Sequence, residues 1–255
     1  MKVEVITSWY NERVLAPLFF NHYRWADKIV VLLEKSTNDG TRDVIESASR
    51  TQPVEVRDTD FPDGLDDLMK TGEINKAVNA SDADWMIVVD SDEFVYPAPY
   101  GKDPRAVLAT ETGNYILSRM WDVWRHESDG DIDPSLPPVP QRIHGEPDLT
   151  SMWASLHHKP CIFRRGAGLP GIGCHVLHDI VPLVKSTESW HGAHWCSADP
   201  CFSVERRVKF RQARLSQENI KHGRGTSSFT EEQLLDMCRA HLGDPVVIQI
   251  CAAVI

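Results

Sequence analysis

The first hundred residues alternate between short apolar runs and longer segments in which apolar residues recur at helical spacing. The short runs are bounded by charged or turn-forming residues, as buried strands usually are. The expected strands cover residues 3–8, 28–33, 54–57 and 85–90, and the expected helices cover residues 12–25, 41–49 and 65–79. Strands that alternate with helices favour a parallel sheet covered by helices on both faces. This part of the chain therefore predicts an α/β fold with a mostly parallel sheet.

The rest of the chain has a less regular pattern. Two more strands are expected at residues 115–121 and 159–164, with a loop rich in proline, glycine and acids at residues 129–147. Residues 203–220 have the spacing of a basic amphipathic helix, and Thr230 starts a last helix with a capping-box pattern. A chain of 255 residues is long for one domain and short for two. We therefore expect one core domain with a C-terminal helical elaboration.

An apolar run at residues 85–89 ends abruptly in Asp90, Ser91, Asp92 and Glu93. Burial of an ionised carboxylate is unfavourable unless a positive charge meets it, so these acids are expected at the open end of the strand. Ligands of open α/β sheets bind beyond the carboxyl ends of the strands. Carboxylates gathered there suit a hard divalent cation, which commonly takes phosphate oxygens as further ligands. The pattern predicts an enzyme that acts on a nucleotide-linked substrate, and a solvated acidic turn is the alternative.

The composition narrows the range of partners and compartments. A formal net charge of −10 argues against nucleic acid or an anionic membrane as the main partner, because both attract clustered positive charge. The chain starts without a leader pattern, has no apolar run of membrane-spanning length, and has six cysteines without a paired framework. We therefore expect a cytoplasmic protein with reduced thiols. The apolar residues 246–255 are expected to dock on the core or to form a homo-oligomer contact.

Three turn motifs carry a resemblance to a known family. Trp9-Tyr10-Asn11-Glu12 ends the first strand, Ser36-Thr37-Asn38-Asp39-Gly40-Thr41 follows the second, and the Asp-Ser-Asp motif closes the unit. Together they resemble the inverting, metal-dependent glycosyltransferases of the GT-A fold, family 2 and its relatives. The resemblance implies a Rossmann-like catalytic domain at residues 1–200, with a nucleotide-binding half at 1–100 and an acceptor half at 101–200. Residues 201–255 would then form the C-terminal helical extension.

The same resemblance implies the activity and its cofactor. A hexosyl or pentosyl group would pass with inversion from a nucleotide-sugar donor, with a UDP-sugar favoured, to an acceptor hydroxyl. Mn²⁺ or Mg²⁺ would neutralise the diphosphate leaving group as a Lewis acid. By the family pattern Asp92 holds the metal directly, and Asp90 contacts the ribose or a metal-bound water. Glu93 is either a further ligand or a helix cap.

The nucleotide-sugar site draws on turns from the whole first half. The residues expected to bind the nucleotide sugar are Thr7, Trp9, Asn11, Glu12, Glu34, Asp39, Lys76, Asp90 and Ser91. Some of these have a simpler structural explanation. Asn11 can cap the helix that starts near Glu12, Asp39 can serve only as a turn former, and Lys76 can be an exposed helical lysine.

The third metal ligand of the family is a histidine in the second half. The chain offers six there, namely His157, His158, His175, His178, His191 and His194. His194 is favoured because aromatic residues flank it and the basic helix follows, with His191 next and His175 third. A rival reading is a zinc site made of His191, His194, Cys196 and Cys201, whose spacing is irregular for zinc.

An inverting transfer also needs a base for the acceptor hydroxyl. Asp122 is favoured because it lies between Trp121 and Trp124, and aromatic faces commonly stack on sugars. The other acids considered are Glu127, Asp129, Asp131, Glu146 and Asp148. The basic helix can turn Arg206, Arg207 or Arg211 towards phosphate, and a solvated helix face is the alternative.

Two other classes of function compete with glycosyl transfer. A nucleotidyltransferase uses a similar sheet but generally needs a glycine- and lysine-rich phosphate loop, which residues 7–13 lack. A non-catalytic nucleotide- or carbohydrate-binding protein is the second rival, and the intact Asp-Ser-Asp motif argues against it.

Overall fold

The computed structural model describes residues 1–146, 158–223, 230–241 and 248–249. A ten-stranded sheet runs in the order β12-β7-β6-β8-β4-β1-β2-β3, with β11 beside β6 and β5 beside β11. Its strands are β1 (Val3–Trp9), β2 (Lys28–Glu34), β3 (Val54–Thr59), β4 (Trp85–Val88), β5 (Glu93–Pro97), β6 (Tyr115–Trp124), β7 (His144–Glu146), β8 (His158–Arg164), β11 (Trp190–Ser197) and β12 (Ile248–Gln249). A separate hairpin pairs β9 (Gly168–Pro170) with β10 (Leu177–Asp179).

The chain direction divides the sheet into two halves. Strands β3, β2, β1 and β4 are parallel, as the alternating pattern of the first hundred residues predicts. Strands β8 and β7 run antiparallel to their neighbours, while β11 runs parallel to β6. The predicted α/β fold class is confirmed, and antiparallel pairing enters with β5 and the strands after it, where the sequence pattern is less regular.

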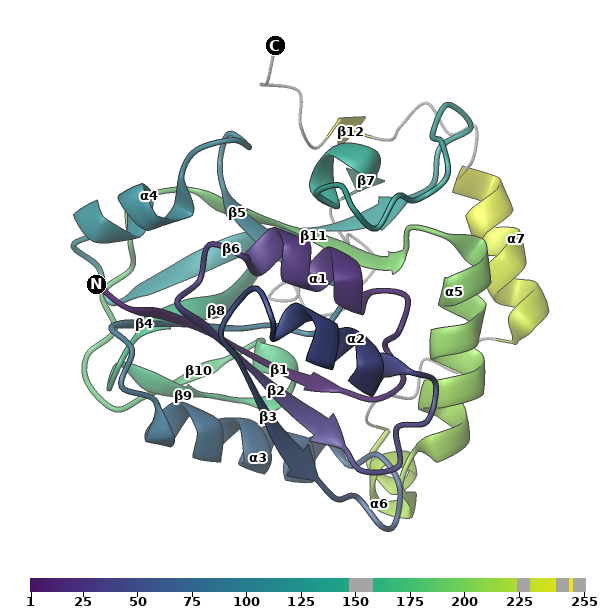
Figure 1. Cartoon of the computed structure of the whole chain (residues 1–255), viewed down its shortest axis with the longest axis horizontal. Helices are drawn as coiled ribbons and strands as arrows, with labels where there is room; N and C mark the ends of the chain where they lie inside the picture. Colours follow the sequence, from purple (N-terminus) through teal and green to yellow (C-terminus); the bar gives the residue numbers. More distant parts are fainter. Residues whose placement is uncertain (147–157, 224–229, 242–247, 250–255) are drawn as a thin grey trace.

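The helices cover both faces of the sheet (Figure 1). They are α1 (Ala16–Tyr23), α2 (Thr41–Ala48), α3 (Asp67–Ala80), α4 (Pro104–Thr110), α5 (Pro200–Val204), α6 (Gln217–Lys221) and α7 (Glu231–His241). Connections between parallel strands are right-handed, so the step direction along the sheet decides the face. The chain steps one way from β1 to β3, which places α1 and α2 together, and steps back to β4, which places α3 on the other face.

Burial explains why the central strands form. β1 lies between β2 and β4, and most of its residues are fully buried because helices cover both faces. Glu4 is the charged exception, and its carboxylate meets the Lys28 ammonium of β2 at 2.9 Å. The strand ends that carry the predicted turn motifs therefore lie at one edge of a rigid, buried sheet.

Two predicted helices differ from the observed ones. The first helix starts at Ala16 rather than at residue 12, because Pro17 fixes its first turn and residues 12–15 form the preceding turns. The predicted helix at residues 203–220 is instead a series of short elements. Helix α5 passes directly into the π-helix η3 (Glu205–Arg211), the short 3-10 helix η4 (Gln212–Arg214) and, after Ser216 as N-cap, α6.

No helix in the described part of the chain is long and apolar enough to cross a membrane. The expected docking or oligomer contact of residues 246–255 falls almost wholly outside the described residues, which include only 248 and 249 of that segment. The arrowheads of β1 and β2 point towards the helical segment that starts with α5 (Figure 1). That edge of the sheet carries the site described next.

Candidate functional site

A cavity of about 170 Å³ opens at the carboxyl ends of β1, β2 and β4. Acids from the strand ends form one wall, and the π-helix and the residues after it form the opposite wall. The strand-end and sheet residues that line the cavity are Ser8, Trp9, Tyr10, Glu12, Glu34, Asp90, Ser91, Asp92, His194 and Cys196. The opposite wall includes Arg206, Arg207, Phe210, Arg211, Gln212 and Arg214. The convergence of the three turns is therefore observed, with a basic wall facing them.

Arg206 reaches from the π-helix to the acids of the facing wall. Its Nε and Nη2 donate to the two carboxylate oxygens of Glu12 at 3.0 Å each, and its Nη1 donates to Asp92 Oδ2 at 2.6 Å. Nη2 also donates to Ser91 Oγ at 3.0 Å. Burial opposes the charge on Arg206, but Asp92 and Glu12 outweigh it and hold the pKa of the guanidinium above its ordinary value. One guanidinium thus ties the first strand turn to the Asp-Ser-Asp motif.

The same contacts set the ionisation of the two acids in different directions. For Glu12, burial is the largest effect and raises the pKa despite the opposing charge of Arg206. For Asp92, burial is outweighed by the charges of Arg206 and His194, which hold the pKa well below its ordinary value. Asp92 is therefore the firmly ionised member of the pair.

Asp90 has a separate partner. Lys70 donates from Nζ to Asp90 Oδ1 at 2.6 Å, from the first turns of α3. Burial would raise the pKa of Asp90, but Lys70 and Lys159 outweigh it and lower the pKa. Lys159 itself is buried and paired with Glu93. Each acid of the motif therefore meets a basic side chain, as the cost of burying a carboxylate requires.

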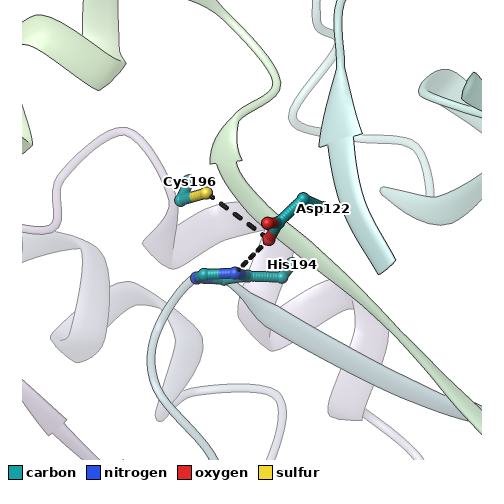
Figure 2. Close-up of side chains that lie close together, drawn as sticks. All are labelled: Asp122, His194 and Cys196. Carbon is teal, nitrogen blue, oxygen red and sulfur yellow. Dashed lines mark hydrogen bonds and ion pairs between the residues drawn. The ribbon is translucent and has the colours of Figure 1, made fainter. Parts of the chain in front are cut away.

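A second group of polar side chains comes from two neighbouring strands. His194 on β11 stands in register with Asp122 on β6, and Cys196 lies two residues further along β11. Figure 2 shows the result, in which His194 Nδ1 lies 2.7 Å from Asp122 Oδ1 and Cys196 Sγ lies 3.8 Å from the same oxygen. His194 Nε2 lies 3.5 Å from Asp92 Oδ2. His194 therefore links the two groups.

The pKa shifts of this second group favour its charged form. For Asp122, burial would raise the pKa, but the hydrogen bond and charge of His194 lower it. For His194, burial would lower the pKa, but Cys196, Asp92 and Asp122 together hold it well above its ordinary value. The Asp122 side chain keeps 23% of its surface exposed, so a substrate can still reach it.

The structure permits a direct test of the expected metal. One ligand atom each from Asp122, His194 and Cys196 lies within 4.8 Å of the others, so these three could hold an ion. Among the described residues Asp90 does not join them, since its carboxylate is bound to Lys70. One oxygen, one nitrogen and one sulfur are a poor donor set for Mn²⁺ or Mg²⁺, which prefer oxygens. The residues as arranged do not fit the hard cation that the resemblance implies.

The same triad answers only part of the zinc alternative. His194 and Cys196 lie together, but His191 packs its ring against Tyr96 and Trp121 instead. The side chain of Cys201 lies outside the described residues. The four-ligand zinc set is therefore not assembled within the described part of the chain.

Several predicted nucleotide-binding residues have structural roles. Thr7 accepts a hydrogen bond from the Trp9 indole at 2.8 Å, and Trp9 packs on Phe19 and Phe20 while also reaching the cavity. Asn11, at a φ of 53°, accepts a bond from the backbone N–H of Asn38 at 2.9 Å. The Asn11 contact joins the turns after β1 and β2, and the Thr7 and Trp9 contacts fix the end of β1 against α1.

Of the other predicted positions, Glu34 lies at the cavity, whereas Asp39 and Lys76 have other roles. Asp39 accepts bonds from the backbone N–H groups of Thr41 and Arg13, which is the turn-forming role. Glu34 lines the cavity and pairs with Arg214, whose guanidinium also stacks 3.7 Å from the Tyr10 ring centre. Lys76 is exposed in the last turns of α3 and pairs with Glu73.

Lys70 is one of the cavity residues that were not predicted from the sequence, together with Asp67 and Arg214. A helix between parallel strands starts at the edge where the preceding strand ends, so its first turn lies nearest the ligand edge. Lys70 is in that first turn and lines the cavity, whereas Lys76 is almost two turns further away. The position of a lysine in the first turn of this helix could therefore have identified Lys70, rather than Lys76, as the residue near the ligand.

A second cavity of about 190 Å³ adjoins the first. Both cavities are lined by Asp67, Lys70, Asp90 and Arg211. The far wall of the second is the glycine-containing segment 170–175, where Gly173 has a φ of 62°. One buried ring nitrogen of His175 has no hydrogen-bond partner among the described residues. Burial lowers the pKa of His175 to about 3, so this ring is neutral.

Comparisons with known proteins leave the family open. No family model matches the chain, and no curated protein matches it either. Among solved structures, HddC from Yersinia pseudotuberculosis matches with 14% identity over 65% of this chain and 75% of that chain, at a TM-score of 0.33. The same protein complexed with GMP-PN matches with 16% identity over 57% and 68%, at a TM-score of 0.34.

A third solved structure matches over more of the chain. It is described as a glucose-1-phosphate thymidylyltransferase from Bacillus anthracis in complex with sucrose, with 10% identity over 94% of this chain and 95% of that chain and a TM-score of 0.31. A thymidylyltransferase is a nucleotidyltransferase, the class set against glycosyl transfer above. Similarities of this low level do not assign an activity to the chain.

Proposed function

We propose that the chain is a transferase that binds a nucleoside diphosphate sugar and moves the sugar to an acceptor hydroxyl. The observation that carries this proposal is the pair of adjoining cavities at the carboxyl edge of β1, β2 and β4, with Lys70 and Arg211 at their junction. A diphosphate that links two uncharged groups needs positive charge in the middle and a pocket on each side. The junction supplies two basic side chains for this purpose, beside the acids Asp67 and Asp90, of which Asp90 is bound to Lys70.

Each part of the donor has a suitable environment. The nucleoside fits the side of the first cavity where Tyr10 and Glu34 lie, since a carboxylate accepts bonds from base or ribose donors. The diphosphate fits the junction, where guanidinium and ammonium groups make charge-assisted hydrogen bonds. The sugar fits the second cavity, where the glycines of segment 170–175 allow close approach of the backbone.

Asp122 is the proposed base. Its lowered pKa keeps it ionised at neutral pH, its contact with His194 fixes its orientation, and its partial exposure allows an acceptor to reach it. The acceptor oxygen forms a bond to the anomeric carbon while its proton passes to Asp122. The bond from that carbon to the diphosphate oxygen breaks, and its electron pair leaves with the diphosphate. Attack from the face opposite the leaving group gives inversion.

The test measures both binding and the product. Wild-type protein should bind one of UDP, GDP or dTDP in calorimetry and release the same diphosphate from the corresponding nucleotide sugar when acceptors are supplied. Asp122→Asn should keep nucleotide affinity within about threefold and lower turnover by about 100-fold or more, the usual scale of a lost general base. Undiminished turnover in Asp122→Asn would remove Asp122 from the proposal.

The same assay separates the rival reaction. A nucleotidyltransferase would instead consume a nucleoside triphosphate and a sugar 1-phosphate, with release of pyrophosphate.

Lys70→Ala should weaken nucleotide binding about tenfold, because Lys70 reaches the cavity junction. Lys102→Ala is the matched control, since this exposed lysine pairs with Glu188 away from the cavities. Equal affinity in both variants would show that the junction does not hold the diphosphate.

A further inference from the structure

The position of Arg206 has a consequence for the chemistry of the leaving group. Its bonds to Glu12, Ser91 and Asp92 engage four of the five guanidinium N–H groups. Among the described residues, this leaves one Nη1 hydrogen for a phosphate oxygen. The side chain is 18% exposed and lines the first cavity. Arg206 is thus a fixed cation whose edge faces the proposed nucleotide.

The same oxygens cannot serve a guanidinium and a metal ion together. Both carboxylate oxygens of Glu12 and one of Asp92 already point at Arg206. A divalent cation could bind these oxygens only by displacing the guanidinium. The displaced guanidinium would still lie near the cation, and the two positive charges would repel each other. Asp90, the other acid of the motif, is bound to Lys70. Each of these three carboxylates is therefore bound to a basic side chain, in a place where a metal ion would have to bind.

A purely structural role explains this arrangement poorly. Burial of an ion pair costs desolvation, and apolar residues of similar size often give equal or greater stability, so the fold itself does not call for Arg206. The residue also lies in a π-helix, a rare form that recurs at functional sites. The wider π turn brings Arg206 and Arg211, five residues apart, to the same cavity. The local backbone thus turns two guanidinium groups towards one ligand position.

We propose that Arg206 supplies the positive charge that a divalent metal supplies in the family this chain resembles, so that the donor is bound and its diphosphate released without a metal ion. Glu12 and Asp92 are the residues that position the guanidinium. As the bond from the anomeric carbon to the diphosphate oxygen breaks, the electron pair stays on the diphosphate and Arg206 neutralises the new charge. The inference rests on the proposed function, because it names the group that binds the diphosphate.

The test is calorimetry with UDP, GDP and dTDP as probes, in EDTA and in Mn²⁺. The wild type should bind one of them in EDTA with a Kd within about threefold of its value in Mn²⁺. Arg206→Ala should bind at least tenfold more weakly in EDTA, and Mn²⁺ should restore part of the affinity, because Glu12 and Asp92 are then free to hold the ion. Arg206→Lys keeps the charge and should retain part of the metal-free binding. Arg50→Ala, at an exposed arginine remote in sequence, should match the wild type.

Two further readouts make the outcome decisive. Electron paramagnetic resonance with Mn²⁺ alone should detect bound ion in Arg206→Ala and much less in the wild type. Circular dichroism checks that each variant folds. If the alanine variant does not fold, the binding measurements on Arg206→Lys still test the inference. Nucleotide binding by the wild type only with Mn²⁺ would overturn the inference and leave the proposed function intact. Absence of binding under every condition would overturn both.

Discussion

His22, a partly buried side chain, makes the stability of the fold depend on pH. It lies on α1 with Nε2 at 2.9 Å from the Val95 carbonyl oxygen, and its ring packs edge-on against Phe94. Burial is the main reason that its pKa falls to about 4. The neutral ring therefore donates its Nε2 proton to the carbonyl, and protonation of the other nitrogen inside the core is costly.

We expect this residue to make unfolding easier at mildly acid pH. The unfolded chain protonates His22 near pH 6.5, whereas the folded chain does so only near pH 4. The unfolded state therefore binds more protons in this window, and the free energy of unfolding falls as the pH drops from about 6.5 to about 4. At pH 5 this group alone should cost about 2 kcal/mol relative to pH 7.5.

The check is urea unfolding of wild type and His22→Gln at pH 7.5 and pH 5. Glutamine keeps an N–H donor for the Val95 carbonyl but does not titrate. The difference in unfolding free energy between the two pH values should be about 2 kcal/mol smaller in the variant. An identical pH dependence in both proteins would show that His22 is not held neutral in the fold.

At the scale of elements, a close backbone contact helps to hold the wall that carries the arginines against the domain. Leu65 donates its backbone N–H to the Arg214 carbonyl, and Ser216 donates to the Leu65 carbonyl at 2.9 Å. Gly64 precedes this contact with a φ of 96°, and a Cβ there would clash with the Arg214 carbonyl oxygen. The conformation and the close approach both require glycine.

Gly64→Ala should therefore detach the segment from residue 212 to residue 216 and weaken nucleotide binding at least fivefold, because Arg214 would lose its place on Glu34. Gly101→Ala is the matched control, since Gly101 has a similar φ of 101° but, apart from its chain neighbours, none of the described residues has an atom within 4 Å of an added Cβ. Both variants carry the backbone strain, about 1 kcal/mol in thermal or urea unfolding. Only the first should lose affinity for the nucleotide in calorimetry. Equal losses in both would mean that strain, and not the contact, is responsible.

The sequence predicted elements best where they are local. The four parallel strands follow from apolar runs that each lie within a few residues, and Asp92 falls at a strand end for the same reason. The neighbourhood of His194 and Asp122 depends on β11 pairing with β6, across 72 residues of sequence, and no periodicity encodes that register. The division of the expected helix 203–220 into shorter elements is also not predicted from the sequence, because α-helical and π-helical turns share the same apolar spacing over short stretches.

At the scale of the whole molecule, the cleft is built from residues that are far apart in the sequence. The turns after the first strands form one side, and the segment after β11 forms the other. Arg206 meets Glu12 across 194 residues of sequence, and Arg214 meets Glu34 across 180. Figure 1 shows α5 and α7 together at one side of the sheet, with α4 at the other. Ligand binding should therefore be coupled most strongly to the segment from α5 to α6.

This coupling can be measured by amide hydrogen exchange. A nucleoside diphosphate at about 100 times its Kd stabilises the bound form by about 2.7 kcal/mol, which corresponds to exchange about 100-fold slower for amides that exchange only when the cleft opens. We expect that slowing in residues 200–221 and not in α4. A uniform slowing across all helices would indicate that the segment opens only with global unfolding.

The long spacing between the partners in the cleft also has a consequence for the newborn chain. Synthesis runs from the N-terminus, so Glu12, Glu34 and Asp92 leave the ribosome well before Arg206 and Arg214 exist. During that interval the parallel half of the sheet carries three carboxylates at one edge without their guanidinium partners, and their mutual repulsion opposes closure of the edge. The edge is therefore completed only after the arginines have been synthesised, and a ribosome stalled before residue 206 should hold a sheet that binds cations at this edge in place of a nucleotide.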